Sequence, residues 1–417
     1  MKRIAVIGGT VNILHRARKL GVGVVLFHRA GAYDPASRKL CDELVEVDFS
    51  DDYPALEREV LARHQARPFD RVMSLTERGL VPAARLNEQL GLGGNLPSVA
   101  EILRNKPEMR RILNAAGISP VRYRVVQDPA GLAEFMQEVG GPVIVKPVDG
   151  SASEGVFRID PGMAVDGRWP QFPGGRGGPL LAEESLEGPE FSVDAYSWRG
   201  EHHVITITRK LLDDAFLEIG HSMPSRLDPH VAKETTGTVR QMLDAVGLVE
   251  GPSHTELRLT PGGPRIIESH NRIGGSRLFE LMGLAYDIDL IEMTVAVPLG
   301  LMSPPSADPE PMAAAAVRYF VPEPGVVRAI DGTASLPTDG SVGLALGVAV
   351  GDAVPHQRTS VDRDRLGCYV VARGSDEDDA IQRCNDVLDS VSIVTSPASA
   401  GSRAASDQPL RPVAQPS

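Results

Sequence analysis

Residues 252–275 read PSHTELRLTPGGPRIIESHNRIGG, in which two runs of alternating apolar and polar residues flank Pro261-Gly262-Gly263. A proline and glycine turn between two such runs predicts a β-hairpin. With the turn centred on Gly262, residues at equal distances from it face each other across the two strands. The expected cross-strand pairs are Thr260 with Pro264, Arg258 with Ile266, and Glu256 with Glu268.

The pair Glu256 and Glu268 is the unusual feature of this hairpin, because two carboxylates would stand opposite each other with Cβ atoms about 5 Å apart. Like charges in that position destabilise a hairpin unless a cation lies between them. The other face carries Leu257, Leu259 and Ile267 and is expected to pack on the core, which leaves the glutamates facing a cavity or solvent. A divalent cation such as Mg²⁺ typically takes one or two carboxylates and fits this pair. The alternatives are two solvated glutamates or a register shifted by one residue.

The composition bounds the class of protein. The chain has 417 residues, which predicts about three domains. Its formal net charge of -12, from 43 basic and 55 acidic residues, argues against a nucleic-acid groove. Cys41, Cys368 and Cys384 lie far apart without a CxxC motif, so neither a disulfide framework nor a thiolate zinc site is expected. No stretch approaches the about 18 apolar residues of a membrane helix, so we expect a cytoplasmic protein without membrane or nucleic-acid partners.

Short β-rich runs alternate with helical stretches over roughly the first 95 residues, which predicts a doubly wound parallel sheet. The expected strands are residues 4–7, 22–27, 44–47 and 71–74, and the expected helices are residues 11–20 and 55–66. The turn Gly8-Gly9-Thr10 lacks the GxGxxG pattern, and the second strand ends in His28-Arg29, where an NAD site would place an acid. A tight turn from strand into helix is therefore favoured over dinucleotide binding.

The rest of the chain is divided by composition and turn residues. Helices are expected at residues 107–116, 131–139 and 231–246, and strands at residues 143–147, 156–159, 180–183, 191–197 and 203–208. Residues 161–179 are rich in glycine and proline and are expected to form an exposed loop. From residue 313 onward, short strands and a helix at 377–388 predict a smaller unit, and the last 20 or so residues are expected to be a disordered tail.

Lys146 ends an apolar strand, where a charge is costly without an anionic partner. The loop 150–155, of sequence GSASEG, follows within a few residues and offers backbone N–H groups to phosphate oxygens. A plain hairpin turn would look the same, and the loop is not the GxxxxGK phosphate-binding motif. This segment alone therefore does not identify a nucleotide site.

Taken together, these segments resemble the ATP-grasp superfamily of carboxylate–amine ligases over about residues 75–300. The motifs that carry the resemblance are Asn105-Lys106 with Met109-Arg110, residues 143–147 (VIVKP), residues 150–155 (GSASEG), residues 183–186 (EESL) with 188–191 (GPEF), and the Glu256 and Glu268 hairpin ending in residues 271–275 (NRIGG). No one of these motifs is decisive, but they occur in the order typical of the family.

The resemblance implies which residues bind the nucleotide and which part of ATP each contacts. They are Lys106 and Lys146 for the phosphates, Ser151 and Ser153 in a mobile loop over the triphosphate, Glu183 or Glu184 with Leu186 for the adenine, and Glu190 for the ribose hydroxyls. The alternative for Lys106 is an ordinary surface lysine at a helix start. The alternative for Glu190 is a solvated loop acid.

Glu256 and Glu268 match the metal ligands of the family, which implies two Mg²⁺ ions with Mn²⁺ as a substitute. Many members place Asn two residues after the second glutamate, whereas His270 stands there in this chain and Asn271 follows. Whether His270 binds the metal or only orients a water is left open. Arg272 resembles the catalytic arginine that stabilises charge on the carboxylate substrate and the tetrahedral intermediate, a role that suits a planar, always charged guanidinium. A salt bridge closing the strand end is the alternative.

Within the superfamily, the chain most resembles the L-amino-acid (dipeptide) ligase-like group. Three segments suggest this group: residues 218–221 (EIGH), 251–256 (GPSHTE) and 271–275 (NRIGG). The substrate contacts implied are Glu77, His221, Gly274 and Gly275. A helix N-terminal acid and a loop histidine are the alternatives for Glu77 and His221. Relatives usually have a helix where this chain has the glycine-rich residues 161–179.

The implied fold class is α/β, an ATP-grasp fold in four segments. They are an N-terminal doubly wound parallel-sheet domain at residues 1–100, an ATP-grasp core at 101–305 with a lid at about 119–183, a small C-terminal α/β domain at 306–395, and the tail at 396–417. The lid is expected to exclude water, because an acylphosphate would hydrolyse in solvent.

The implied function is ATP-dependent ligation of two small molecules, an amino acid or related carboxylate and an amine-bearing amino acid. It passes through an acylphosphate and releases ADP and phosphate. The alternatives are another ATP-grasp ligase or carboxylase, of purine-pathway or bicarbonate-using type, and a nucleotide-binding module without turnover. A homodimer is a reasonable expectation. Side-chain types do not identify the two substrates, because specificity depends on pocket shape.

Overall fold

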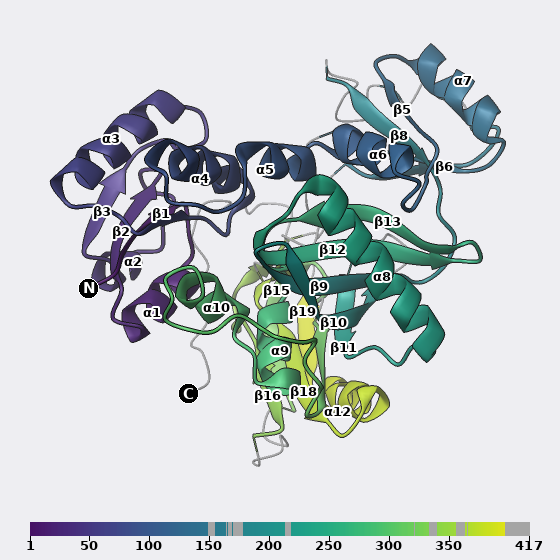
Figure 1. Ribbon diagram of the computed structural model, residues 1–417. Coiled ribbons are helices and arrows are strands. Elements are labelled where there is room, and N and C mark those ends of the chain that lie inside the picture. The colour runs from purple at the N-terminus through teal and green to yellow at the C-terminus, as the bar shows by residue number, and fades with distance from the viewer. Residues whose placement is uncertain are drawn as a thin grey trace.

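Figure 1 shows the computed structural model of the chain, with an N-terminal unit on the left, a small sheet at the upper right and a large sheet in the centre. The structure describes residues 1–148, 155–163, 165, 169, 178–212, 218–320, 322–332, 340–355, 363–364 and 366–396. Ser151 and Ser153 lie outside the described residues, as do most of the segment 161–179 and the tail from residue 397.

The N-terminal unit is the parallel sheet that the sequence predicts. Its strands are β1 (Arg3–Ile7), β2 (Gly23–His28), β3 (Glu43–Glu46) and β4 (Arg71–Met73), in the order β3-β2-β1-β4. Its helices are α1 (Val11–Lys19), α2 (Ser37–Leu40), α3 (Tyr53–Ala66), α4 (Glu77–Leu90) and α5 (Pro97–Arg104). Ile4 and Val6 pack with α1, whereas Ala5 and Ile7 pack with α3 and α4. Helices therefore cover both faces, as in a doubly wound sheet.

The small sheet at the upper right of Figure 1 is antiparallel. It consists of β5 (Tyr123–Val126), β6 (Val143–Pro147), β7 (Phe157–Ile159) and β8 (Leu180–Glu184) in the order β5-β8-β6-β7, covered by α7 (Pro129–Val139) and preceded by α6 (Lys106–Ala115). Ile144 pairs with Glu183, and Lys146 lies two residues further along the same face of β6. This register brings Lys146 and Glu183 together on one side of the sheet.

The central sheet has eight antiparallel strands in the order β13-β12-β9-β10-β11-β14-β18-β16. Their bounds are β9 (Glu190–Trp198), β10 (Glu201–Leu212), β11 (Glu218–Met223), β12 (Glu250–Thr260), β13 (Gly263–His270), β14 (Ala314–Tyr319), β16 (Val342–Ala345) and β18 (Tyr369–Gly374). Strands β14, β18 and β16 come from the C-terminal part of the chain and join the sheet through β11. The C-terminal part also contributes a three-stranded sheet of β17 (Ala353–Val354), β15 (Gly325–Asp331) and β19 (Ser392–Ser396).

Helices cover the central sheet and join it to the N-terminal unit. Helix α8 (Pro229–Val246) packs on β9, β12 and β13, and α12 (Glu377–Ser390) packs on β14 and β18. Helices α9 (Leu278–Tyr286) and α10 (Leu290–Ala296) share a core with α1 and β1. The N-terminal sheet and the central sheet are therefore held through one continuous hydrophobic layer. In the described part of the chain, no helix has both the length and the apolar character needed to span a membrane.

The β12–β13 hairpin corrects part of the predicted register. Near the turn, Thr260 pairs with Gly263, one residue away from the expected partner, because the turn has two residues rather than three. A bulge between Glu256 and Leu257 then restores the expected pairing of Glu256 with Glu268. The expected pairs Thr260 with Pro264 and Arg258 with Ile266 are therefore wrong, whereas Glu256 with Glu268 is confirmed.

The same bulge changes which isoleucine packs in the core. Leu257 is buried in the core and Leu259 packs against it, as predicted, but Ile266 is the fully buried isoleucine. Ile267, expected in the core, lines the cleft beside the glutamates. A bulge adds one residue to one strand, and no hydrophobic pattern of this length reveals it.

Arg110 fixes α6 to both neighbouring sheets. Its side chain is 1% exposed, its Nε atom donates to Glu183 Oε1 at 2.8 Å, and an Nη2 hydrogen bond of 2.8 Å reaches the Ile266 carbonyl. We expect Arg110→Met to lower the free energy of unfolding by about 3–5 kcal/mol, because Glu183 loses a buried partner. Urea unfolding measures this, with Arg111→Met as the control, since Arg111 is 60% exposed. Equal losses in the two variants would contradict the prediction.

Candidate active site

A cleft of about 1010 Å³ lies between the small sheet and the central sheet. Its walls combine apolar side chains, including Ile144, Leu186 and Leu212, with a set of charged ones. The charged side chains are Lys106, Lys146, Arg158, Glu183, Glu184, Glu190, Lys210, Glu218, Glu256, Arg258 and Glu268. All the residues predicted from the sequence to contact nucleotide or metal line this cleft, except His270 and the two serines outside the described residues.

Lys146 is buried at the wall formed by the small sheet. Its Nζ atom lies 2.7 Å from Glu183 Oε2, and the other oxygen of that carboxylate accepts from Arg110. Burial raises the pKa of Glu183, but the charges of Arg110 and Lys146 outweigh it, and the pKa is lowered. Glu183 therefore holds Lys146 in position as a charged acid.

The other predicted adenine and ribose residues have different surroundings. Glu184 lines the cleft but directs its carboxylate to Arg122, with a distance of 2.8 Å between Oε2 and Nε. The Leu186 carbonyl accepts a hydrogen bond of 3.3 Å from Arg258 Nη1. The carboxylate of Glu190 lies between Arg258 Nη2 at 3.1 Å and Lys210 Nζ at 2.9 Å. Arg258 thus connects two positions that the sequence assigned to the nucleotide.

Glu256 and Glu268 stand opposite each other on β12 and β13, and each has its own counterions. Glu256 Oε2 lies 2.9 Å from Lys210 Nζ, and Glu268 Oε2 lies 3.1 Å from Lys106 Nζ. Burial raises the pKa of Glu256, but the charge of Lys210 is the main opposing effect and the pKa falls to about 2. The pKa of Glu268 is also held well below its ordinary value, with burial opposed by His270 and Lys106. Both carboxylates are therefore charged.

The residues present fit a divalent cation. Among the described residues, no three His, Cys, Asp or Glu side chains form a ready-made metal site. Two adjacent charged carboxylates are nevertheless the usual protein share of a Mg²⁺ site that completes its coordination with water and phosphate oxygens. Glu256 and Glu268, facing the same cleft as Lys106 and Lys146, meet this requirement.

His270 and Arg272 converge on one acid from the N-terminal unit. Glu77, the first residue of α4, accepts a hydrogen bond of 2.6 Å from Arg272 Nε and lies 2.9 Å from His270 Nδ1. The other imidazole nitrogen lies 3.3 Å from Glu268. Burial lowers the pKa of His270, but Glu268 and Glu77 outweigh it and raise the pKa, which favours the protonated ring. In this arrangement His270 links the Glu268 and Glu77 carboxylates.

The predicted substrate contact His221 lies in β11, and Gly274 and Gly275 lie in the segment that follows β13. His221 is buried with Nε2 at 3.4 Å from Glu218 Oε2. A Cβ atom on Gly274 would come within 2.7 Å of His254 Nδ1, so this position requires glycine. A Cβ atom on Gly275 would meet nothing within 4 Å. Only the first glycine is therefore explained by packing.

A second cavity of about 600 Å³ is lined by Ser276 and Arg277, which directly follow these glycines in the chain. Ser276 and Arg277, which line it, have positive φ angles of 50° and 65°, a backbone conformation that costs energy for residues with a side chain. Ser276 Oγ donates to Glu218 Oε2 at 2.9 Å. Because Glu218 also lines the first cleft, this one carboxylate lies at the boundary between the two cavities.

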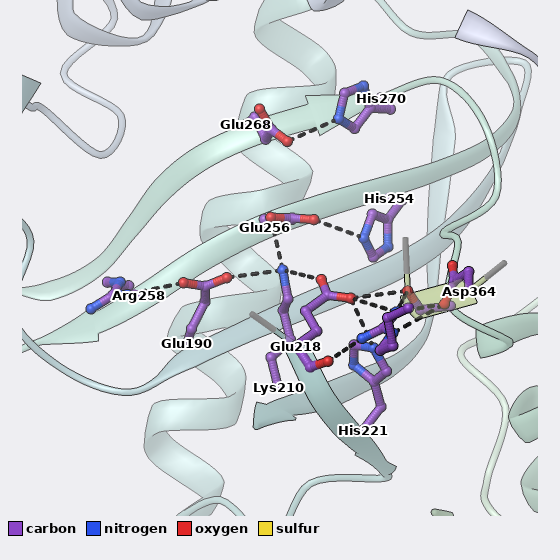
Figure 2. Close-up of polar contacts among 12 residues, drawn as sticks. Glu190, Lys210, Glu218, His221, His254, Glu256, Arg258, Glu268, His270 and Asp364 are labelled. Carbon is purple, nitrogen blue, oxygen red and sulfur yellow. Dashed lines mark hydrogen bonds and ion pairs between the residues drawn. The ribbon is translucent and has the colours of Figure 1, made fainter. Parts of the chain in front are cut away.

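Lys210 is the main cleft residue that the sequence did not identify. Figure 2 shows its ammonium group between Glu190, Glu218 and Glu256. The distances from Lys210 Nζ to their nearest carboxylate oxygens are 2.9, 3.0 and 2.9 Å. Burial lowers the pKa of Lys210, but the charges of these glutamates outweigh it and hold the pKa well above its ordinary value. Lysine occurs only seven times in the chain, against 36 arginines. The scarcity of lysine was the signal in the sequence from which a specific partner for Lys210 could have been expected.

Family comparisons match three segments of the chain. Residues 14–94 match an ATP-grasp N-terminal domain, residues 172–280 an ATP-grasp domain, and residues 318–396 an L-amino acid ligase C-terminal domain 2. The solved L-amino acid ligase from Bacillus licheniformis superposes with a TM-score of 0.80 at 23% identity, over 95% of this chain and 99% of that one. This likeness shows a shared fold.

Three relatives found by sequence are similar to this chain over only part of their length. An uncharacterized protein of Sinorhizobium fredii is 28% identical, over 76% of this chain and 67% of its own length. The alanine–anticapsin ligase of Bacillus subtilis is 25% identical over 55% and 53%, and the L-arginine-specific L-amino acid ligase of the same species is 26% identical over 64% and 66%. The match thus spans about half of the first ligase and about two thirds of the second.

His254 gives this site a testable pH dependence. Its Nδ1 lies 2.9 Å from Asp194 and its Nε2 3.4 Å from Glu256. Burial lowers the pKa of His254, but Asp194 and Glu256 outweigh it and raise the pKa to about 9. The charged ring therefore stabilises the fold fully below about pH 6.5 and loses this contribution as the pH rises through about 9.

We expect the unfolding free energy of the parent protein to exceed that of His254→Asn by a margin that shrinks by about 3 kcal/mol or less between about pH 6 and about pH 9.5. Chemical unfolding at a series of pH values measures the margin. His230→Asn, at an exposed histidine of α8, is the control and should show no such trend. A margin independent of pH would argue that the ring is neutral.

Proposed function

The chain belongs to the ATP-grasp superfamily, and from this membership we propose that it is an ATP-dependent carboxylate–amine ligase of the L-amino acid ligase group. The proposed reaction joins an amino acid or related carboxylate to an amine-bearing amino acid. The observation that carries the proposal is the single cleft that combines Glu256 and Glu268 with Lys106 and Lys146. Arg272 follows within four residues of Glu268 and is joined to it through Glu77 and His270.

The chemistry explains why this set of charges is needed. A carboxylate is a poor electrophile, so its oxygen first attacks the γ-phosphorus of ATP, which forms an acylphosphate and releases ADP. The amine then attacks the acyl carbon, loses a proton and expels phosphate, which leaves an amide. Positioning and charge neutralisation supply the catalysis, without a covalent enzyme nucleophile.

In the proposed roles, Lys106 and Lys146 bind phosphate oxygens, and Glu190 and the backbone of Leu186 bind ribose and adenine. Arg272 stabilises negative charge on the carboxylate and on the tetrahedral intermediate with its fixed set of donors. Glu256 and Glu268 would hold divalent cations, two Mg²⁺ with Mn²⁺ as a substitute, and such ions neutralise triphosphate charge when bound.

The second cavity is the proposed place for substrate side chains. Glu218 lies at its boundary with the cleft, and Ser276, which directly follows Gly274 and Gly275 in the chain, lines it. Glu77 accepts a hydrogen bond from Arg272 and so positions the arginine, while the His221 imidazole contacts the Glu218 carboxylate. In the proposal, these two residues therefore shape the substrate side of the site through their neighbours.

A matrix of carboxylates and amines tests the proposal. We expect ADP release that requires both ATP and an amino acid, and a dipeptide or amide product detected by mass spectrometry. Hydroxylamine should trap the acylphosphate as a hydroxamate, because it replaces the amine in the second step. Glu268→Ala protein is the control for contaminating ATPase activity.

Two results would replace this function with another. ADP release that depends on bicarbonate or a purine-pathway acid, without a dipeptide or hydroxamate, would indicate a different ATP-grasp reaction. Tight ATP binding without ADP release for any pair in the matrix would indicate a nucleotide-binding module.

Lys146→Ala, Glu268→Ala and Arg272→Ala should each reduce turnover by about 10²-fold or more, because each removes a charge that the proposed transition state requires. Steady-state ADP release measures kcat and KM for each protein. The matched control is Arg226→Ala, at a side chain that is 75% exposed and pairs with Asp378. Unchanged turnover in Glu268→Ala protein would remove the metal assignment.

A further inference from the structure

Lys210 occupies a position defined by three carboxylates from three strands. Glu190 begins β9, Glu218 begins β11 and Glu256 lies within β12, and one oxygen of each is within 3.0 Å of Lys210 Nζ. An ammonium group has three N–H donors, so these three oxygens satisfy it completely. The side chain of Lys210 is 5% exposed. The lysine is therefore a buried internal cation with no remaining donor for a ligand.

The second oxygen of each glutamate is held by a different partner. Arg258 Nη2 lies 3.1 Å from Glu190 Oε2, Ser276 Oγ donates to Glu218 Oε2 at 2.9 Å, and His254 Nε2 lies 3.4 Å from Glu256 Oε1. Figure 2 shows the arginine and histidine contacts of this group. Each carboxylate is thus held in place through its second oxygen, and its first oxygen points at the position that Lys210 Nζ occupies. The negative charge at this position, which includes the proposed metal ligand Glu256, attracts a divalent cation as well as an ammonium group.

The geometry points to Lys210 as a positioning residue that stands in for the metal ion at Glu256 until the metal arrives bound to nucleotide. This inference rests on the proposed metal role of Glu256. A metal ion alone must break the Lys210–Glu256 pair inside a buried cluster, whereas a metal–nucleotide complex also brings phosphates that bind Lys106 and Lys146. Lys210 keeps Glu190 and Glu218 as partners when Glu256 turns to the metal.

A substitution of Lys210 distinguishes this role from a purely structural one. Replacing Lys210 with Met keeps the length of the side chain but removes the competing positive charge. If the lysine only supports the fold, its loss weakens the binding of every ligand, including the metal ion. If it occupies the position of the metal, its loss makes metal binding without nucleotide stronger, because a like positive charge within about 4–6 Å of a bound cation disfavours that ion by about one to three powers of ten.

The experiment measures Mn²⁺ binding without nucleotide by electron paramagnetic resonance. We expect Lys210→Met to bind Mn²⁺ about tenfold or more tightly than the parent protein. Lys233→Met, at an exposed lysine of α8, is the control and should bind like the parent. Adding Glu256→Gln to Lys210→Met should remove the gain. Circular dichroism and the unfolding temperature establish that each variant is folded.

Unchanged or weaker Mn²⁺ binding by folded Lys210→Met protein would overturn the inference. If that variant does not fold, Lys210→Gln replaces it, because the amide can still donate to two carboxylates while lacking the charge; the same gain is expected, and its absence also overturns the inference. Product formation by the parent protein tests the ligase proposal separately. A parent protein without ligase activity but with the expected Mn²⁺ gain would leave this role of Lys210 standing.

Discussion

Two partly buried carboxylates that face each other across a hairpin are the constraint on which the site depends. Glu256 and Glu268 repel each other unless positive charge is supplied nearby, and the fold supplies it as one lysine and one histidine for each. Lys210 and His254 serve Glu256, while Lys106 and His270 serve Glu268. Such buried pairs are weak evidence for stability, but they fix where each acid points.

These counterions come from separate parts of the chain, so the charge balance also ties the architecture together. Lys106 begins α6, Lys210 lies in β10, and His270 passes the contact on to Glu77 at the start of α4. The N-terminal unit, the central sheet and the helix leading to the small sheet therefore meet at the two glutamates. Displacement of any one element would leave a buried charge without its partner, which is strongly unfavourable.

The sequence predicted the elements better than their register. Alternating strands and helices in the first part of the chain were recovered because buried parallel strands are short continuous apolar runs. In the hairpin, the prediction of Glu256 opposite Glu268 was right although the adjacent pairs were wrong, because a shorter turn and a bulge cancel. The same bulge explains why the prediction that Ile267 packs in the core was wrong, because the extra residue on β13 changes the face on which this side chain lies. Local patterns specify which residues form a strand, but one inserted residue reverses the face that each side chain takes.

The sequence by itself determined the class of the protein: the order of the motifs, the paired acids of the hairpin, and the lysines at positions 106 and 146 that line the cleft. Only the tertiary structure decided how these charges are neutralised. Lys210 meets Glu190, Glu218 and Glu256 on three different strands, and Glu77 reaches Arg272 from helix α4 of the N-terminal unit. Such contacts join residues far apart in the chain. They depend on strand order and register, which no local spacing encodes.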